Sequence, residues 1–196
     1  HLGVEKRLQR ARDIIFWPYM TNDLKSKVLN CTICLENRNS NVKEPMVSNN
    51  IPSRPWETVA TDLFHWNDTN YIVAVDLYSR YFEVGRLTST RTEMVIHKLK
   101  GFFATHGIPS KVISDNGPQF SSQEFETFAK SWDFKHVTSS PLHSQGNGVA
   151  ERCIQTVKKL FTKAKQSGSD PYISILEYRN SPLSCGKSPA QLLMSR

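Results

Sequence analysis

Three acidic residues occupy positions where a carboxylate is unusual or where the chain turns. Asp62 lies within the apolar run Val-Ala-Thr-Asp-Leu-Phe, where an acid is out of place unless it lies near a sheet edge or serves a site. Asp115 ends a second apolar run directly before Asn-Gly, and Glu151 follows Gly-Asn-Gly in the first turn of an expected helix. Clustered carboxylates can hold two divalent cations about 4 Å apart, an arrangement that cuts and joins phosphodiesters.

Taken singly, each acid also has a structural interpretation. Asp115 can cap the turn that Asn-Gly begins, and Glu151 can favour the N-terminus of its helix electrostatically. Asp76 is a fourth acid at the end of a strand-like run, but Ser79 and Arg80 follow closely and can pair with it. We therefore assign Asp76 a structural role and treat the other three acids as the candidate catalytic set.

The elements that must position these acids alternate between strands and helices. Three strand-like runs joined by turns are typical of antiparallel hairpins, and a helix, a fourth strand, a second helix and a fifth strand follow. The expected strands are Thr58–Phe64, Tyr71–Asp76, Tyr81–Leu87, Lys111–Ser114 and Phe134–Thr138. A loop from Ser139 to Gly148 then leads to a long basic helix from about Val149 to Lys165, and a last helix begins near Asp170.

Capping boxes predict where the two helices between the strands begin. Thr90 with Glu93, and Ser121 with Glu124, have the Ser/Thr-x-x-Glu spacing of such boxes, and Gly107 would end the first helix. One face of that helix is apolar and should cover the sheet. Its residues are Val95, Ile96, Leu99, Phe102 and Phe103.

A smaller region precedes this larger domain. Residues 1–38 contain a helix-compatible stretch with Leu8, Ala11, Ile14 and Ile15 at helical spacing, and a second short helix from Asp23 to Leu29. Residues 39–55 are polar and contain three prolines, so they indicate a linker. We therefore expect a small N-terminal module over 1–38 and a main domain over 56–196.

The composition favours a polyanionic partner but does not establish one. Lys and Arg outnumber Asp and Glu by 25 to 18 among 196 residues, the pI is near 9.3, and no apolar run approaches the roughly 20 residues that span a bilayer. The chain begins without an initiator Met or a signal-like segment, which suggests a fragment. Its four cysteines are too few and too unevenly spaced for a disulfide framework and suit a reducing, intracellular compartment.

Several motifs along nearly the whole chain together resemble the integrases of retroviruses and of Gypsy-class long-terminal-repeat retrotransposons, the second group more closely. Thirty-five residues separate Asp115 from Glu151, and each acid lies in its family context. The motifs are Thr61-Asp62-Leu63-Phe64, Val75-Asp76-x-x-Ser79-Arg80, Ser114-Asp115-Asn116-Gly117-Pro118-Gln119-Phe120, Gln145-Gly146-Asn147-Gly148-x-x-Glu151-Arg152, Tyr178-Arg179-Asn180-x-Pro182 and Ser188-Pro189.

The resemblance implies an α/β, RNase H-like core: a five-stranded mixed sheet flanked by helices and preceded by a small, truncated helical zinc-binding module. In such a core the adjacent first and fourth strands and a packed helix bring Asp62, Asp115 and Glu151 together around two Mg²⁺ or Mn²⁺ ions. The implied activity is DNA 3′-end processing followed by strand transfer. The implied partners are element ends and target DNA, bound by a homo-multimer in the nucleus.

The long helix carries five positive charges and no acid after Glu151. Lys158 lies nearly two turns beyond Glu151 on the same face, and Gln155 lies one turn from both. The family uses this face to hold the DNA end, although a solvated basic face is the alternative. Asn116 can instead serve the turn that follows Asp115. The expected DNA-binding residues are Asn116, Gln119, Asn147, Arg152, Gln155, Lys158 and Lys159.

Cys31-x-x-Cys34 resembles the second half of the His-His-Cys-Cys zinc module that precedes integrase cores, with His1 as the second histidine. The first histidine would lie before residue 1, so the chain supplies three of the four ligands that a structural zinc requires. Either the chain begins inside the module, or the module is degenerate and metal-free. A redox role for the Cys-x-x-Cys pair lacks the surrounding strand–turn–helix.

Two other functions share parts of this pattern. A host gene derived from such an element can persist as a DNA-binding or interaction protein without catalysis, even with all three acids in place. An RNase H-like nuclease shares the fold, but would not be expected to carry the basic helix or the cysteine pair.

Overall fold

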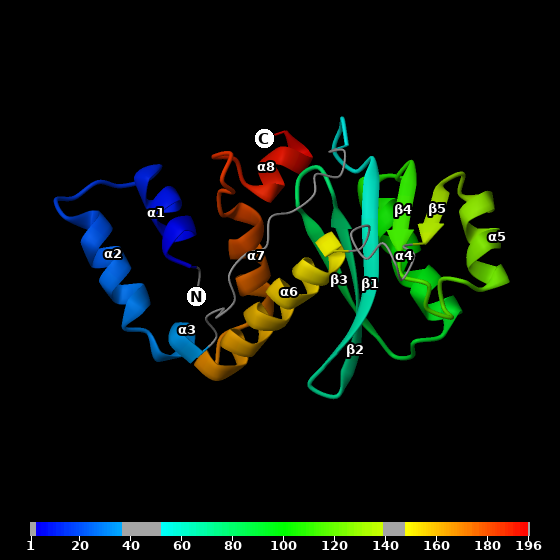
Figure 1. Cartoon of the computed structure of the whole chain (residues 1–196), viewed down its shortest axis with the longest axis horizontal. Helices are drawn as coiled ribbons and strands as arrows, with labels where there is room; N and C mark the ends of the chain where they lie inside the picture. Colours follow the sequence, from blue (N-terminus) through cyan, green and yellow to red (C-terminus); the bar gives the residue numbers. More distant parts are fainter. Residues whose placement is uncertain (1–2, 37–51, 139–147, 196) are drawn as a thin grey trace. The chain divides into compact units, whose positions relative to one another are not determined.

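A computed structural model describes residues 3–36, 52–138 and 148–195 (Figure 1). The chain forms two compact units, one of His1–Pro45 with Thr156–Arg196 and one of Met46–Gln155. In chain order the elements are α1 (Val4–Arg12), α2 (Met20–Leu29), α3 (Thr32–Glu36), β1 (Thr58–Trp66), β2 (Thr69–Asp76), β3 (Phe82–Leu87), α4 (Thr92–His106), β4 (Lys111–Ser114), α5 (Gln123–Ser131), β5 (Lys135–Thr138), α6 (Gly148–Ser167), α7 (Pro171–Asn180) and α8 (Pro189–Met194).

The second unit is built on a mixed sheet with the strand order β3-β2-β1-β4-β5. Strands β1, β2 and β3 form antiparallel neighbours, and β4 and β5 run parallel to β1. Asn67 and Asp68 join β1 to β2 with φ values of 48° and 57°, the left-handed pair that a tight two-residue hairpin requires. The predicted fold class, α/β with a five-stranded mixed sheet flanked by helices, is confirmed.

Helices α4 and α5 pack beside this sheet (Figure 1). Both helices bury aromatic side chains. Val95, Leu99 and Phe103 of α4 are buried, as the periodicity predicts, while Ile96 and Phe102 are half-buried. Around Phe103 lies an aromatic cluster in which each fully buried ring stabilises the fold by about 1.5–3 kcal/mol. Its members include Phe125, Phe128 and Phe134.

Both predicted capping boxes are wrong in detail. The residue before α4 is Arg91, and it makes no side-chain cap, so Thr90 does not begin this helix. The cap of α5 is Ser122, whose hydroxyl accepts the N–H of Phe125 at 3.2 Å. Ser121 is occupied elsewhere, because its hydroxyl donates to the Gly117 carbonyl at 3.1 Å.

In the first unit, α1 ends earlier than the apolar spacing predicts. Ile14 and Ile15 lie beyond the helix and are 73% and 56% exposed, whereas Leu8 is buried. Helix α8 was not predicted, although Ser188 and Gln191 form a complete capping box there. None of the helices within the described ranges combines the length and the apolar character that crossing a membrane needs.

Candidate active site and metal-binding residues

Asp62 lies in β1, and Asp115 directly follows the neighbouring parallel strand β4. Strand β1 pairs with β4 through Val59 with Val112 and Ala60 with Ile113. Both aspartates lie two residues beyond the last of these pairs, so the pairing brings them to the same end of the paired segment. Alternation along the strand puts Asp62 on the same face of the sheet as Ala60.

Local hydrogen bonds orient both carboxylates. The Asp62 carboxylate accepts the N–H of Leu63 at 2.7 Å, and the Asp115 carboxylate accepts the N–H of Gly117 at 3.2 Å. Both side chains are half-buried. Asp115 therefore caps the turn through one carboxylate oxygen, as its structural interpretation predicts. Its second carboxylate oxygen can still act as a metal ligand. Two paired carboxylates are a donor set that suits a hard divalent cation.

Gly117 brings the turn after β4 close to two functional candidates. A Cβ at this position would collide with the Gln119 side-chain amide and lie 3.1 Å from a carboxylate oxygen of Asp115. Gln119 is half-buried beside this turn, whereas Asn116 is exposed. The structure thus brings Gln119, but not Asn116, against the Asp115 turn.

A serine and a histidine lie directly behind Asp115, a contact that the sequence analysis did not single out. The Ser114 hydroxyl donates to the Asp115 carbonyl at 2.7 Å and lies 2.9 Å from Nε2 of His136. His136 is half-buried against the Phe125 ring, at a centroid distance of 4.7 Å, and burial lowers the pKa of its imidazole. No sequence motif marks the pair, because it joins β4 to β5.

Glu151 lies in the first turn of α6 and is exposed. Across residues 3–36, 52–138 and 148–195, no three His, Cys, Asp or Glu side chains form a group that could hold a metal ion. Within the described residues, the structure therefore does not gather Asp62, Asp115 and Glu151 into one group of three.

The candidate DNA-binding residues of α6 differ in exposure. Arg152 and Gln155 are exposed, and the Arg152 guanidinium donates to the Gly148 carbonyl at 2.9 Å. Lys158 and Lys159 are half-buried. Asn147, the remaining candidate, lies outside the described residues.

Cys31 and Cys34 lie together at the start of α3. Cys31 directly precedes the helix, and its sulfur accepts the backbone N–H of Cys34, which lowers the Cys31 pKa. Burial, followed by the hydrogen bond to Cys31, raises the Cys34 pKa. Two neighbouring cysteine sulfurs at a helix start suit half of a tetrahedral zinc site. His1 lies outside the described residues.

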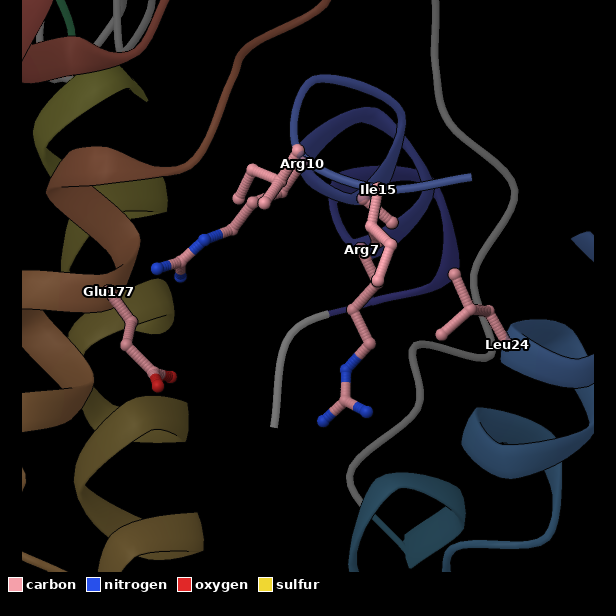
Figure 2. Close-up of a pocket in the computed structure, with 7 residues that line it drawn as sticks. Arg7, Arg10, Ile15, Leu24 and Glu177 are labelled. Carbon is pink, nitrogen blue, oxygen red and sulfur yellow. The ribbon is translucent and has the colours of Figure 1, made fainter. Parts of the chain in front are cut away.

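A separate pocket of about 290 Å³ lies within the first unit (Figure 2). Arg7 and Arg10 of α1, Ile15 beyond it, Leu24 of α2 and Glu177 of α7 help to line it. Figure 2 shows two guanidinium groups and one carboxylate at its rim among aliphatic side chains. None of the candidate catalytic, DNA-binding or zinc-binding residues lines this pocket.

The fold defines a class of protein, the α/β domains with a mixed five-stranded sheet. In this chain, one acid lies in a central strand and a second directly follows the neighbouring strand. A family model described as the integrase core domain matches residues 52–144, and one described as the integrase zinc-binding domain matches residues 1–40. The chain therefore contains an integrase core domain and an integrase zinc-binding domain. The core match contains Asp62 and Asp115 but ends before Glu151, and the zinc-domain match contains both paired cysteines.

Curated relatives are much longer than this chain. An uncharacterised protein of Caenorhabditis elegans, K02A2.6, is 32% identical over 203 residues, which cover 100% of this chain and 16% of the relative. The Gag-Pro-Pol polyprotein of sheep pulmonary adenomatosis virus is 32% identical over 122 residues, or 62% of this chain and 7% of the polyprotein. The chain thus spans less than a fifth of these relatives.

Solved structures share the fold at low sequence identity. The simian T-cell lymphotropic virus intasome in complex with PP2A regulatory subunit B56 gamma contains a chain that is 22% identical with a TM-score of 0.69, covering 90% of this chain and 68% of that one. The HTLV-2 integrase catalytic core domain in complex with magnesium is 22% identical with a TM-score of 0.63, covering 74% and 99%. The predicted RNase H-like fold is therefore confirmed.

Proposed function

We propose that this chain is the catalytic part of an integrase of a Gypsy-class retrotransposon or a retroviral-type element. Its activity would be metal-dependent 3′-end processing of DNA followed by strand transfer into target DNA. The observation that supports the proposal is the parallel pairing of β1 with β4, because Asp62 and Asp115 both lie two residues beyond its last pair, Ala60 with Ile113, inside the matched integrase core. Such a pair supplies oxygen ligands from two rigid elements at fixed spacing.

Asp62, Asp115 and Glu151 would hold two Mg²⁺ or Mn²⁺ ions. When bound, such ions supply activation of the attacking oxygen and charge neutralisation on the leaving oxygen. The chain's own contribution would be to fix its acids before substrate arrives: β1 carries Asp62 beside β4, and the Gly117 N–H orients Asp115 directly after β4. Glu151 would complete the set from the first turn of α6.

Cations and amides near these acids would hold DNA. Arg152 and Gln155 are exposed one and four residues beyond Glu151, so they can meet phosphate oxygens and base edges. Gln119 lies against the Asp115 turn and would contact DNA closest to the reacting phosphate. The remaining proposed DNA contacts are Asn116, Asn147, Lys158 and Lys159.

The paired cysteines would bind Zn²⁺ together with His1, as three ligands of the module in residues 1–38. Residues 39–55 would link this module to the catalytic core in residues 56–196. The working form would be a nuclear homo-multimer bridging two DNA ends. The intasome and the dimeric HTLV-2 core among the similar structures support multimer formation.

The decisive experiment is a nicking and strand-transfer assay on labelled DNA ends with Mg²⁺ or Mn²⁺. It compares the chain, extended through the first zinc-binding histidine, with its Glu151→Gln variant. Activity that this substitution abolishes supports the proposal and assigns Glu151 to the site. Activity that persists in the variant removes Glu151 from the catalytic set.

A rival function is that of a catalytically inactive, integrase-derived DNA-binding or interaction protein. The same assay distinguishes it, because such a protein binds DNA ends yet neither nicks nor joins them. Retained DNA binding without activity in either protein would replace the enzyme proposal with this rival.

A further inference from the structure

Asp115 lies one residue beyond the end of β4, so strand pairing does not hold its backbone. The last pair of β4 with β5 is Ser114 with Thr138. What holds the Asp115 backbone here is the Ser114 hydroxyl, which donates to the Asp115 carbonyl at 2.7 Å. The carboxylate is tied to the Gly117 N–H at 3.2 Å. The residue is therefore held at its main chain and at its side chain by separate hydrogen bonds.

His136 holds the Ser114 hydroxyl in turn. A serine hydroxyl has one hydrogen, and here it points to the Asp115 carbonyl, so the 2.9 Å contact with Nε2 of His136 requires the imidazole to donate. Burial lowers the His136 pKa and so favours the neutral ring, while the contact with Ser114 favours the tautomer with the proton on Nε2. The ring itself is fixed by Phe125, at a centroid distance of 4.7 Å.

The sheet register separates this pair from the proposed metal-binding face. Val112 pairs with both Val59 and His136, so Ser114 and His136 point to the face opposite to that of Asp62. His136 is thus placed to act on Asp115 only through the Ser114 hydroxyl and the main chain.

We propose that His136 is a positioning residue: through the Ser114 hydroxyl, it fixes the main chain of Asp115 and so the direction of that carboxylate. This inference rests on the proposed function of Asp115. Outer hydrogen-bond partners of metal ligands commonly change metal affinity by 10- to 100-fold. Because His136 acts through one intervening residue, we expect a smaller effect of about three- to tenfold.

The test is Mn²⁺ binding to the 196-residue chain, measured by the loss of the free-ion electron paramagnetic resonance signal. His136→Phe keeps an aromatic ring against Phe125 but removes the donor, and should weaken binding by about three- to tenfold. His136→Gln returns an N–H near the Nε2 position and should restore most of the affinity. Adding His136→Phe to Ser114→Ala should cause no further loss, because both substitutions break one chain of contacts.

Phe128→Leu is the matched packing control. Phe128 belongs to the same buried cluster and contacts Phe125 at 5.7 Å, one step away from His136. This substitution should lower the thermal midpoint while Mn²⁺ affinity stays at the wild-type value. If Phe128→Leu weakens Mn²⁺ binding as much as His136→Phe does, the effect is general packing and the proposal is overturned.

Nitrogen-15 NMR of the wild-type imidazole keeps the proposal testable if the variants do not fold. A proton on Nε2 of His136 supports the contact, and a neutral ring protonated only on Nδ1 overturns it. Asp115→Asn distinguishes the proposal that Asp115 binds metal from the proposal that His136 positions Asp115. If Asp115→Asn binds Mn²⁺ like wild type, the proposed function of Asp115 fails; if it does not, unchanged binding by His136→Phe defeats the positioning role alone.

Discussion

The chain contains two pairs of proposed metal ligands, and they lie in differently packed parts of the fold. Asp62 lies in β1 and Asp115 directly follows β4, and residues of both strands, such as Val59 and Val112, are completely buried. Cys31 and Cys34 stand at a five-residue helix with no buried residue of its own. The aspartate pair is thus organised by the fold before any metal binds, whereas the cysteine pair would gain order from its metal.

The largest expected effect on activity comes from substituting a member of the pair Asp62 and Asp115, which we call the preorganised pair. Asp115→Asn removes a charged ligand while keeping its shape, and should lower the rates of end processing and strand transfer by roughly a thousandfold, because several kcal/mol of transition-state stabilisation are lost. The unfolding midpoint should stay unchanged, since the side chain is only half-buried. Single-turnover kinetics and thermal denaturation measure the two quantities.

Asp133→Asn is the control for this substitution. Asp133 is an exposed acid in the same unit, with φ of 53°, a conformation that Asn also accepts. It should leave both rates unaltered. Equal losses in the two variants would mean that general charge, rather than a metal-binding pair, governs activity.

Zinc removal tests whether the region around Cys31 and Cys34 depends on bound metal for its order. A chelator should speed amide hydrogen exchange in α1, α2 and α3 while leaving β1 to β5 protected, because the energy of binding a structural zinc is energy of folding. Cys34→Ser should reproduce the chelator's effect. Cys185→Ser, at an exposed and isolated cysteine, should not. Equal loss of protection in the strands would show that the sheet also depends on zinc.

A third substitution contrasts a structural acid with the metal-binding pair. Asp76 is completely buried and accepts hydrogen bonds from the Tyr78 N–H, the Ser79 N–H and the Ser79 hydroxyl, at 3.2, 3.0 and 2.6 Å. Asp76→Ala leaves these three donors without an acceptor and should lower the free energy of unfolding by about 3 kcal/mol. Asp76→Asn keeps one acceptor and should cost less.

Activity per folded molecule is the discriminating readout for Asp76. Denaturant titration gives the folded fraction, and the strand-transfer rate is divided by it. The ratio should match wild type for both Asp76 variants. A ratio that collapses as it does for Asp115→Asn would place Asp76 in the active site and refute its structural assignment.

The strands were largely predictable from the sequence because they depend on local patterns. Alternating apolar runs located all five strands to within a few residues, and Ser79 following Asp76 indicated the buried turn. Features that depend on competition between neighbours were not predictable in this way. Ser121 and Ser122 have equally good capping chemistry, and only the contact of Ser121 with the Gly117 carbonyl decides between them.

Pairing between strands that lie far apart in the sequence was expected only from the family resemblance, because no local pattern specifies it. The register of β1 with β4 sets which residues of the two strands share a face, and a shift of one residue would reverse this arrangement. The approach of His136 to Ser114 depends on the same pairing between β4 and β5. The role of Glu151 still rests on its motif, because helix periodicity specifies a face but not the distance to a strand.

The smallest expected effect comes from Gly117, where the turn approaches the preorganised pair. Gly117→Ala places a methyl group against the Gln119 amide and 3.1 Å from an Asp115 oxygen. Gly117 lacks a positive φ, so the alanine backbone is unstrained and stability should change by less than about 1 kcal/mol. Activity should fall about fivefold, equivalent to roughly 1 kcal/mol in the barrier. Gly101→Ala, with open space around its Cβ, is the neutral control.

Combining Gly117→Ala with Gln119→Ala separates the two neighbours of the new methyl group. Gln119 can swing away because its amide is the end of a flexible side chain, whereas Asp115 is held by the Gly117 N–H and by the Ser114 hydroxyl. If the carboxylate is the sensitive partner, activity stays low in the double variant and Mn²⁺ affinity falls in both. Full activity in Gly117→Ala itself would show that the Asp115 carboxylate can shift without loss of function. The fold would then hold Asp62 and Asp115 less rigidly than we infer from their contrast with Cys31 and Cys34.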